Sequence, residues 1–141
     1  MCVLGREKIN TGVRSTVLVV DDDVLALELY SRELSGDYQV LTSRSVQETR
    51  HVLQTRRLDL MVIEPAINED EGWALLSEIE SIADPPYVIL CSVEDERKAG
   101  LGQGANAYLV KPVLPNALHR LIDQFLLKTK KKTKTKLGKG A

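Results

Sequence analysis

Four charged residues follow apolar runs of the chain and could act together as one site. Asp21 and Asp22 end the run TVLVVDD, and Glu64 ends the run LDLMVIE. Lys111 ends AYLVK and is the one matching cation. Carboxylates at close range repel one another, so such a group needs a cation, a proton or the lysine to compensate its charge. These residue types predict either a cation-binding site or an internal ion pair.

The elements that would position these residues alternate between strands and helices. Five apolar runs are typical of buried strands, and a segment with helical character follows each of them. The expected strands are 16–22, 38–43, 58–64, 87–92 and 107–111. Their connections are too short for anything but crossovers, which predicts an α/β fold: a doubly wound, five-stranded parallel sheet with helices on both faces.

This topology brings the charged residues to one edge. In a doubly wound sheet, ligands bind where the carboxyl ends of the strands meet at the topological switch point. Helix capping would explain a single acid there, but not an acid pair, a third acid and a lysine together. Asp23 can cap the helix after the first strand, and Ser45 with Glu48 forms a capping box at the start of the second helix.

Charge divides the chain into three parts. The net charge of -1 hides two opposed segments, because 7 of the 19 basic residues are lysines of 128–141, whereas all 20 acidic residues precede them. We expect an N-terminal arm over 1–14, one domain over 15–127 and a disordered Lys/Thr-rich tail over 128–141. The lysines of this tail could contact a polyanion such as nucleic acid.

Several kinds of function are disfavoured. No apolar run approaches the roughly 20 residues of a membrane span, and the first residues lack the apolar stretch of a secretory signal, so we expect a cytoplasmic protein. Cys2 and Cys91 lack metal-site spacing and are expected to be free thiols. His51 and His119 have no ligand-type partner nearby in the sequence and are expected on helix surfaces.

Three segments, in order, resemble the response regulator receiver domain of two-component signalling, which has the CheY-like, flavodoxin-like fold. VLVVDDD is similar to the family's first strand with its acidic pair, and LDLMVIE to the third strand with the phospho-acceptor. GANAYLVKP is similar to the signature around the fifth strand. The resemblance covers about residues 15–127 and implies a signalling module rather than an enzyme.

The resemblance implies roles for individual residues. Asp21 and Asp22 fall on the pair that holds Mg²⁺, with Asp22 the more direct ligand. Lys111 falls on the residue that contacts the phosphoryl group, and Tyr108 on the aromatic switch position. Lys111 and Pro112 match a pair whose peptide bond is usually cis in the family.

The sequence departs from the family at the phospho-acceptor, where Glu64 replaces the phosphorylated aspartate. One extra methylene moves the carboxylate about 1.3–1.5 Å further, into space that a phosphoryl group needs. Phosphoryl transfer depends on the position of the reacting atoms to within about 1 Å. We therefore expect Glu64 to stay unphosphorylated and to form a partly buried ion pair with Lys111.

Three neighbouring positions also differ from the family. The hydroxyl-bearing switch residue after the fourth strand is replaced by Cys91, unless a shifted register presents Ser92 instead. Pro65 removes a backbone N–H that could face a bound phosphate. Asn68 stands where the family commonly has proline, which alters the turn.

These features predict an atypical, stand-alone receiver that acts as a phosphorylation-independent signalling and protein-interaction module. It would require no cofactor, with Mg²⁺ a possible ligand of Asp22 and Asp21. A signalling partner would bind residues 94–127, the switching face of the resembling family, and a homodimer could form. The Glu64 state could imitate the phosphorylated form or hold an inactive one.

Two alternatives stay open. The first is a functional phosphoacceptor receiver of a two-component phosphorelay. The second is a flavodoxin-like cofactor binder, against which stands the lack of a GxGxxG or P-loop motif after the first strand.

Overall fold

Five parallel strands form a single sheet in the computed structural model, which describes residues 13–140 and the side chains of 13–127. Residues 1–12, which make up most of the predicted arm, lie outside the described residues. The strands are β2 (Thr16–Val20), β3 (Gln39–Ser43), β4 (Leu60–Ile63), β5 (Tyr87–Ser92) and β6 (Ala107–Val110). Their order is β3-β2-β4-β5-β6, so the direction of winding reverses between β2 and β4. The predicted doubly wound sheet is confirmed.

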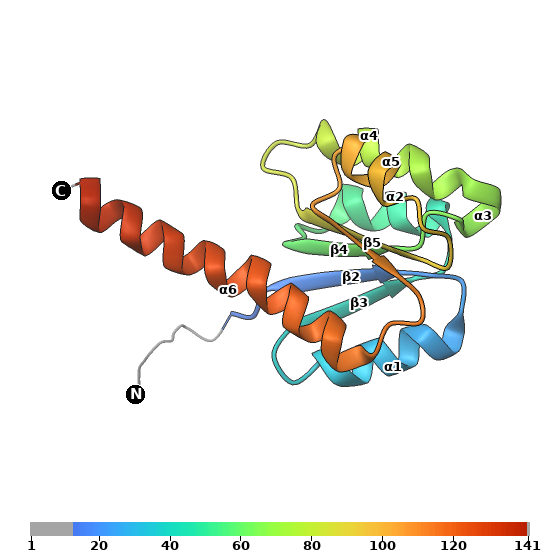
Figure 1. Ribbon diagram of the computed structural model, residues 1–141, viewed down its shortest axis with the longest axis horizontal. Helices are drawn as coiled ribbons and strands as arrows, with labels where there is room; N and C mark the ends of the chain where they lie inside the picture. Colours follow the sequence, from blue (N-terminus) through green and yellow to red (C-terminus); the bar gives the residue numbers. More distant parts are fainter. Residues whose placement is uncertain (1–12, 141) are drawn as a thin grey trace.

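Helices cover both faces of this sheet (Figure 1). They are α1 (Val24–Leu34), α2 (Val46–Thr55), α4 (Ala74–Glu80), α5 (Arg97–Gly102) and α6 (Pro115–Gly140). Between α2 and α4 lie the short turn α3 (Ile67–Asp70), whose backbone is left-handed from Asn68 to Asp70, and the 3₁₀ turn η1 (Glu71–Trp73). α1 and α6 lie on one face, and α2, α4 and α5 on the other. Within the described residues, none of these helices combines the length and the apolar character that crossing a bilayer requires.

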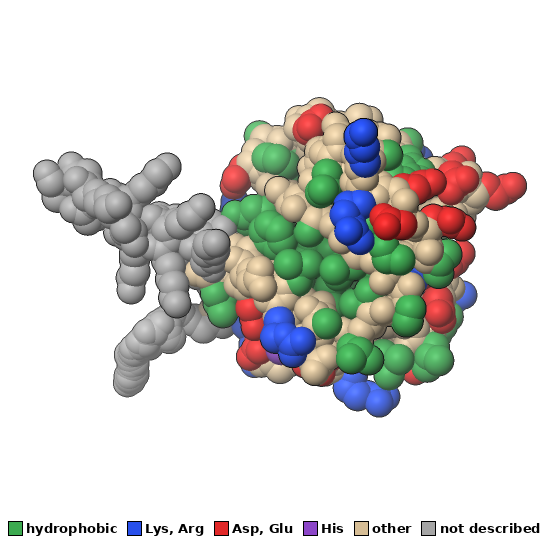
Figure 2. All heavy atoms as spheres, in the orientation of Figure 1, with side chains coloured by type: hydrophobic (Ala, Val, Ile, Leu, Met, Phe, Trp, Pro, Cys, Tyr) green, Lys and Arg blue, Asp and Glu red, His purple; other side chains and the backbone are tan. Residues whose placement is uncertain are grey.

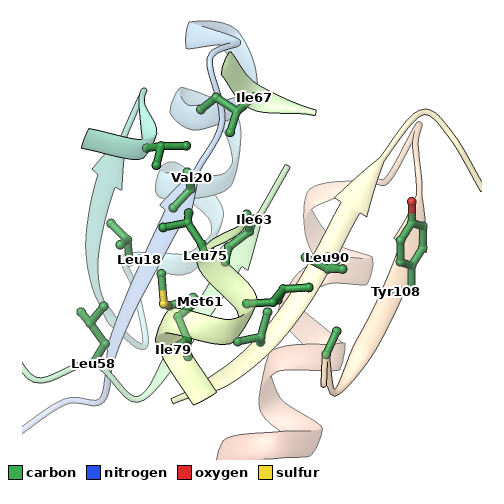
Figure 3. Close-up of a cluster of buried hydrophobic side chains, with 14 residues drawn as sticks. Leu18, Val20, Leu58, Met61, Ile63, Ile67, Leu75, Ile79, Leu90 and Tyr108 are labelled. Carbon is green, nitrogen blue, oxygen red and sulfur yellow. The ribbon is translucent and has the colours of Figure 1, made fainter. Parts of the chain in front are cut away.

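The strand side chains alternate between two hydrophobic cores, one for each face. Val17 and Val19 of β2 pack with α1 and α6, whereas Leu18 and Val20 pack with α2 and α4 (Figure 3). Successive residues of a strand point to opposite faces, so a strand between two helical layers must be apolar throughout. This is why the central strands read as unbroken apolar runs in the sequence.

The predicted caps hold the starts of α1 and α2. The Asp23 carboxylate accepts hydrogen bonds from the N–H groups of Leu25 (3.0 Å) and Ala26 (3.4 Å). Ser45 Oγ accepts from the N–H of Glu48 at 3.0 Å. The Glu48 carboxylate accepts from the N–H of Arg44 at 2.6 Å, one residue earlier than in a standard capping box.

The prediction of a disordered tail from Lys128 is wrong for the backbone, because α6 continues to Gly140. The change in composition at Lys128 marks the end of the apolar face and not the end of the helix. Extending a helix that is already formed needs no new nucleus, and lysine is a good helix former. Figure 1 shows this part of α6 projecting beyond the sheet.

Helix α5 approaches β6 closely at Gly100. A Cβ atom at this position would lie 2.7 Å from Cδ2 of Tyr108 and 2.9 Å from Cδ1 of Leu90. Real Cβ atoms do not approach other heavy atoms this closely. Gly100 therefore makes room for the buried Tyr108 ring.

We expect Gly100→Ala to destabilise the protein by about 1–3 kcal/mol, because the added methyl overpacks a filled core. The measurement is urea-induced unfolding. Gly102→Ala is the matched control, because it lies in the same helix and its Cβ would meet nothing within 4 Å. Alanine there should be neutral or slightly stabilising, since it favours helix over glycine by about 1 kcal/mol. Equal losses in both variants would contradict the Tyr108 contact.

Candidate functional site

Lys111 lies between two carboxylates at the carboxyl edge of the sheet. Its Nζ donates to Oδ2 of Asp21 at 2.8 Å and to Oε1 of Glu64 at 3.0 Å. The three side chains are only 17%, 6% and 9% exposed, in the order Lys111, Asp21 and Glu64. The ion pair predicted between Glu64 and Lys111 is confirmed, and Asp21 shares the same lysine.

Each of these residues stands one step beyond a strand and is still attached to the sheet. Their backbone N–H groups donate to the neighbouring strand: Asp21 to Ser43 (3.0 Å), Glu64 to Val20 (3.0 Å) and Lys111 to Ser92 (2.7 Å). The side chains therefore start from fixed points on three strand ends. The peptide bond between Lys111 and Pro112 is cis, as the resemblance implied.

The second oxygen of each carboxylate also has a hydrogen-bond donor. Oδ1 of Asp21 accepts from the N–H of Asp23 at 3.0 Å. Oε2 of Glu64 accepts from the N–H of Ala66 at 3.1 Å. Both buried carboxylates are thus bonded through both of their oxygens by groups of the protein itself.

The carboxylates hold Lys111 in its charged form. Burial alone lowers the pKa of Lys111, but hydrogen bonds to Asp21 and Glu64, together with their negative charges, raise that pKa above its ordinary value. The lysine stays protonated at any physiological pH. Two nearly buried acids and one cation leave this cluster with a net negative charge.

Asp22 does not join this cluster. Its side chain is exposed, and no hydrogen bond or ion pair links it to another described side chain. Carboxylate oxygens are the ligands that Mg²⁺ prefers. Asp21, Asp22 and Glu64, however, do not each place an oxygen within 4.8 Å of the others. With Lys111 bonded to Asp21 and Glu64, the residues as arranged do not fit Mg²⁺.

The register of β5 decides how Cys91 and Ser92 are oriented. Cys91 pairs with Leu109 in the sheet, so it lies on the same face as Lys111 and packs in the core beside α1 and α6. Ser92 pairs with Val110 on the opposite face, and its Oγ accepts from the N–H of Glu94 at 3.3 Å. The thiol, and not the hydroxyl, lies toward the Lys111 cluster.

The Cys91 thiol is held in its neutral form. Burial raises the pKa of Cys91 to about 11, which the positive charge of Lys111 only partly offsets. The side chain is a member of the core rather than a reactive thiolate.

The side chain of Tyr108 points inward and is buried. Its ring lies beside Gly100 of α5 and belongs to the same hydrophobic cluster as Leu90, whose members Figure 3 shows as sticks. Its hydroxyl donates to the backbone carbonyl of Glu94 at 2.5 Å. This contact ties β6 to the loop between β5 and α5.

The loop after Glu64 has an unusual backbone. Asn68, Glu69 and Asp70 have φ values of 54°, 57° and 71°, a left-handed region that costs energy for residues other than glycine. Oδ1 of Asn68 accepts from the N–H of Val46 at 2.8 Å, which anchors the loop to α2. Proline cannot adopt a positive φ, so this conformation of the loop excludes proline at position 68.

The environment of His119 differs from the one that its sequence position predicts. This residue was expected on a helix surface, but its side chain is only 17% exposed and lies among carboxylates of α1 and α6. A hydrogen bond to Glu33 is the main cause that raises the pKa of His119. One neighbour could have been predicted from the sequence, because Asp123 follows His119 by four residues, a spacing that places both side chains on one side of a helix.

Comparison with known proteins identifies a family. The model of the response regulator receiver domain matches residues 17–123. The chain is 28% identical over 123 residues to the probable transcriptional regulator ycf27 of Cyanophora paradoxa, which covers 85% of this chain and 52% of that protein. It is 32% identical over 114 residues to the transcriptional regulatory protein GlrR of Escherichia coli K12, covering 78% of this chain and 26% of that protein.

Another relative is closer in size. An uncharacterized 14.6 kDa protein of Leptolyngbya boryana is 30% identical over 123 residues, which covers 83% of this chain and 94% of that protein. By contrast, the chain spans about half or less of the two transcriptional regulators.

Solved structures show the same fold. The chemotaxis response regulator CheY4 of Vibrio cholerae aligns with a TM-score of 0.74 at 21% identity, over 80% of this chain and 99% of that one. A CheY-like receiver domain protein of Methanospirillum hungatei JF-1 aligns with a TM-score of 0.77 at 24% identity, over 84% and 98%.

We expect Lys111→Met to destabilise the protein by about 3–5 kcal/mol, because it leaves two buried carboxylates without their cation. Urea unfolding measures the change. The control is Arg50→Met, which removes the ion pair between Arg50 and Glu78. The side chain of Arg50 is 46% exposed and that of Glu78 is 41% exposed. Water and salt screen that pair, so the control should lose far less stability. A Lys111→Met variant as stable as the wild type would show that the cluster is not held together by charge.

Cys91 should resist alkylation in the folded protein. In a Cys2→Ser variant at pH 8, a thiol with a pKa of about 11 has roughly two orders of magnitude less thiolate than an ordinary one. Burial slows the reaction further. Iodoacetamide labelling followed by mass spectrometry should therefore be at least 100-fold faster in guanidinium chloride than in buffer, by the same thiolate argument. Comparable rates in both solvents would show that the thiol is exposed.

Proposed function

Because the chain belongs to the response regulator receiver domain family of two-component signalling, we propose that it is a degenerate receiver, a protein-interaction module that works without a phosphorylation cycle. One observation carries the proposal. Lys111 binds Asp21 and Glu64 at once, and both carboxylates have donors on both of their oxygens.

Glu64 is poorly placed to act as a phosphoryl acceptor. In-line attack needs a carboxylate oxygen that is free to reach phosphorus, together with a cation that is free to meet the phosphoryl oxygens. Here Oε1 of Glu64 is bonded to Lys111 and Oε2 to the N–H of Ala66. Whichever oxygen attacks phosphorus already accepts one of these bonds, which its approach to a phosphoryl group would weaken.

The surroundings of Glu64 also offer few donors to a phosphoryl group. Pro65 has no backbone N–H, and the next N–H, of Ala66, is taken by Glu64 itself. The thiol of Cys91 is a weak donor and is buried in the core beside α1 and α6. Removing donors from this position weakens the stabilisation of the transferred charge.

The contact surface for a signalling partner would be residues 94–127. Its exposed apolar side chains include Leu101 (45% exposed) and Leu114 (70% exposed), which suit a protein contact. Figure 2 shows hydrophobic side chains gathered in the middle of the face that it views. Tyr108, held inward by its bond to Glu94, fixes this surface in one shape. A homodimer could use the same surface, and the lysines of 128–141 could add contact with a polyanion.

The test is phosphorylation by a small donor. Wild-type protein incubated with acetyl phosphate and Mg²⁺ should show no gain of about 80 Da in its intact mass, because the Glu64 oxygens and Lys111 are already bonded to each other. A stoichiometric adduct located on Glu64 would contradict the proposal and favour the working phosphoacceptor.

Two variants make this test sharper. Glu64→Asp shortens the side chain by one methylene and should gain a partial, labile adduct, because it leaves space between the carboxylate and Lys111. Glu64→Gln keeps the length but removes the nucleophilic carboxylate, so it should gain none. An adduct that persists in Glu64→Gln would place the phosphorylation on another residue.

A further inference from the structure

A cluster on the far side of the molecule from α2 and α4 combines one histidine with three carboxylates. His119 and Asp123 come from α6, Glu33 from α1, and Asp37 from the turn between α1 and β3. We propose that Asp37, His119 and Asp123 form a binding site for one divalent first-row transition-metal ion such as Zn²⁺. This site is separate from the Asp21, Glu64 and Lys111 cluster and goes beyond the proposed function.

The three ligand atoms already lie close together. One atom from each residue is within 4.8 Å of the others, and among the described residues this is the one such trio of histidine, cysteine or acid side chains. Nε2 of His119 is 2.8 Å from Oδ2 of Asp37 and 3.8 Å from Oδ1 of Asp123. Ligands on a tetrahedral ion with bonds of about 2.0–2.1 Å are about 3.3–3.4 Å apart, so each distance needs to change by only about 0.5 Å.

The residues are also oriented as metal ligands are. A histidine that binds a metal usually donates its other ring N–H to a carboxylate, which fixes the ring. Nδ1 of His119 is 2.8 Å from Oε2 of Glu33, and Nε2 is 2.8 Å from Oδ2 of Asp37, so a metal ion at Nε2 would replace the proton that His119 shares with Asp37. The hydroxyl of Tyr38 donates to Oδ1 of Asp123, so a second candidate ligand is oriented too.

Charge favours a cation at this place. Glu33, Asp37 and Asp123 have no lysine or arginine partner within ion-pair distance among the described side chains, so a histidine alone faces three acids. Asp37 is 63% exposed, which leaves one side of the site open to solvent for entry of an ion and for water ligands.

The ligand set points to a class of metal. Imidazole with carboxylates suits Zn²⁺, Co²⁺ and Ni²⁺, whereas Mg²⁺ prefers oxygen ligands alone. An ion bound here would join α6 to α1 and to the turn before β3, three elements that pack against each other (Figure 1). It would therefore strengthen the attachment of α6 to the domain.

The experiment is a calorimetric titration of the full chain with Zn²⁺ and, in a second arm, with Mg²⁺. We expect one equivalent of Zn²⁺ to bind, with a rise in melting temperature, and Mg²⁺ to give neither effect. His119→Gln and Asp37→Asn should each weaken Zn²⁺ binding at least tenfold. Glu33→Gln, which replaces the outer carboxylate by an uncharged amide, should weaken it about 10–100-fold.

His51→Gln is the matched control, because His51 is the one other histidine of the chain and is exposed on α2. It should bind Zn²⁺ like the wild type. Asp37→Asn changes an exposed side chain, so its result stands even if His119→Gln unfolds. The proposal is overturned if the wild type binds no Zn²⁺, if binding survives in Asp37→Asn, or if Mg²⁺ binds equally well.

Discussion

The ion pair of Lys111 with Asp21 and Glu64 is the contact on which the rest of the site depends. It joins the ends of three strands, β2, β4 and β6, and it is nearly closed to solvent. Inside a protein, charges that are paired and fully hydrogen-bonded fix one geometry, because any other leaves a buried charge without a partner. The carboxylate oxygens of Asp21 and Glu64 are thereby bonded to the protein's own groups.

The surroundings of this ion pair are consistent with it. Cys91 lies on the same face as Lys111 but contributes an apolar, neutral thiol, and Pro65 contributes no N–H. The loop that follows is held by Asn68 in a left-handed conformation that proline could not adopt. At this edge of the sheet, Pro65 and the buried thiol of Cys91 therefore offer few hydrogen-bond donors beside Lys111.

His119 and Lys111 each form hydrogen bonds to two carboxylates, in two separate clusters. The carboxylates come from separate elements in both clusters, so each cluster joins parts of the chain that are far apart in sequence. The difference is exposure. The Lys111 cluster is nearly closed, whereas Asp37 leaves the His119 cluster open to water, and an open carboxylate can accept an ion from solution.

Local sequence patterns predicted the alternation of strands and helices, the caps at Asp23 and Ser45, and the meeting of Asp21, Glu64 and Lys111 at one edge. These follow from local periodicity and from the rule that parallel strands end together. That Cys91 rather than Ser92 lies toward Lys111 could not be predicted in this way, since it depends on the register between β5 and β6. The tertiary structure also decided the carboxylate neighbours of His119 that lie outside α6, because packing of α6 against α1 brings together residues that no local pattern connects.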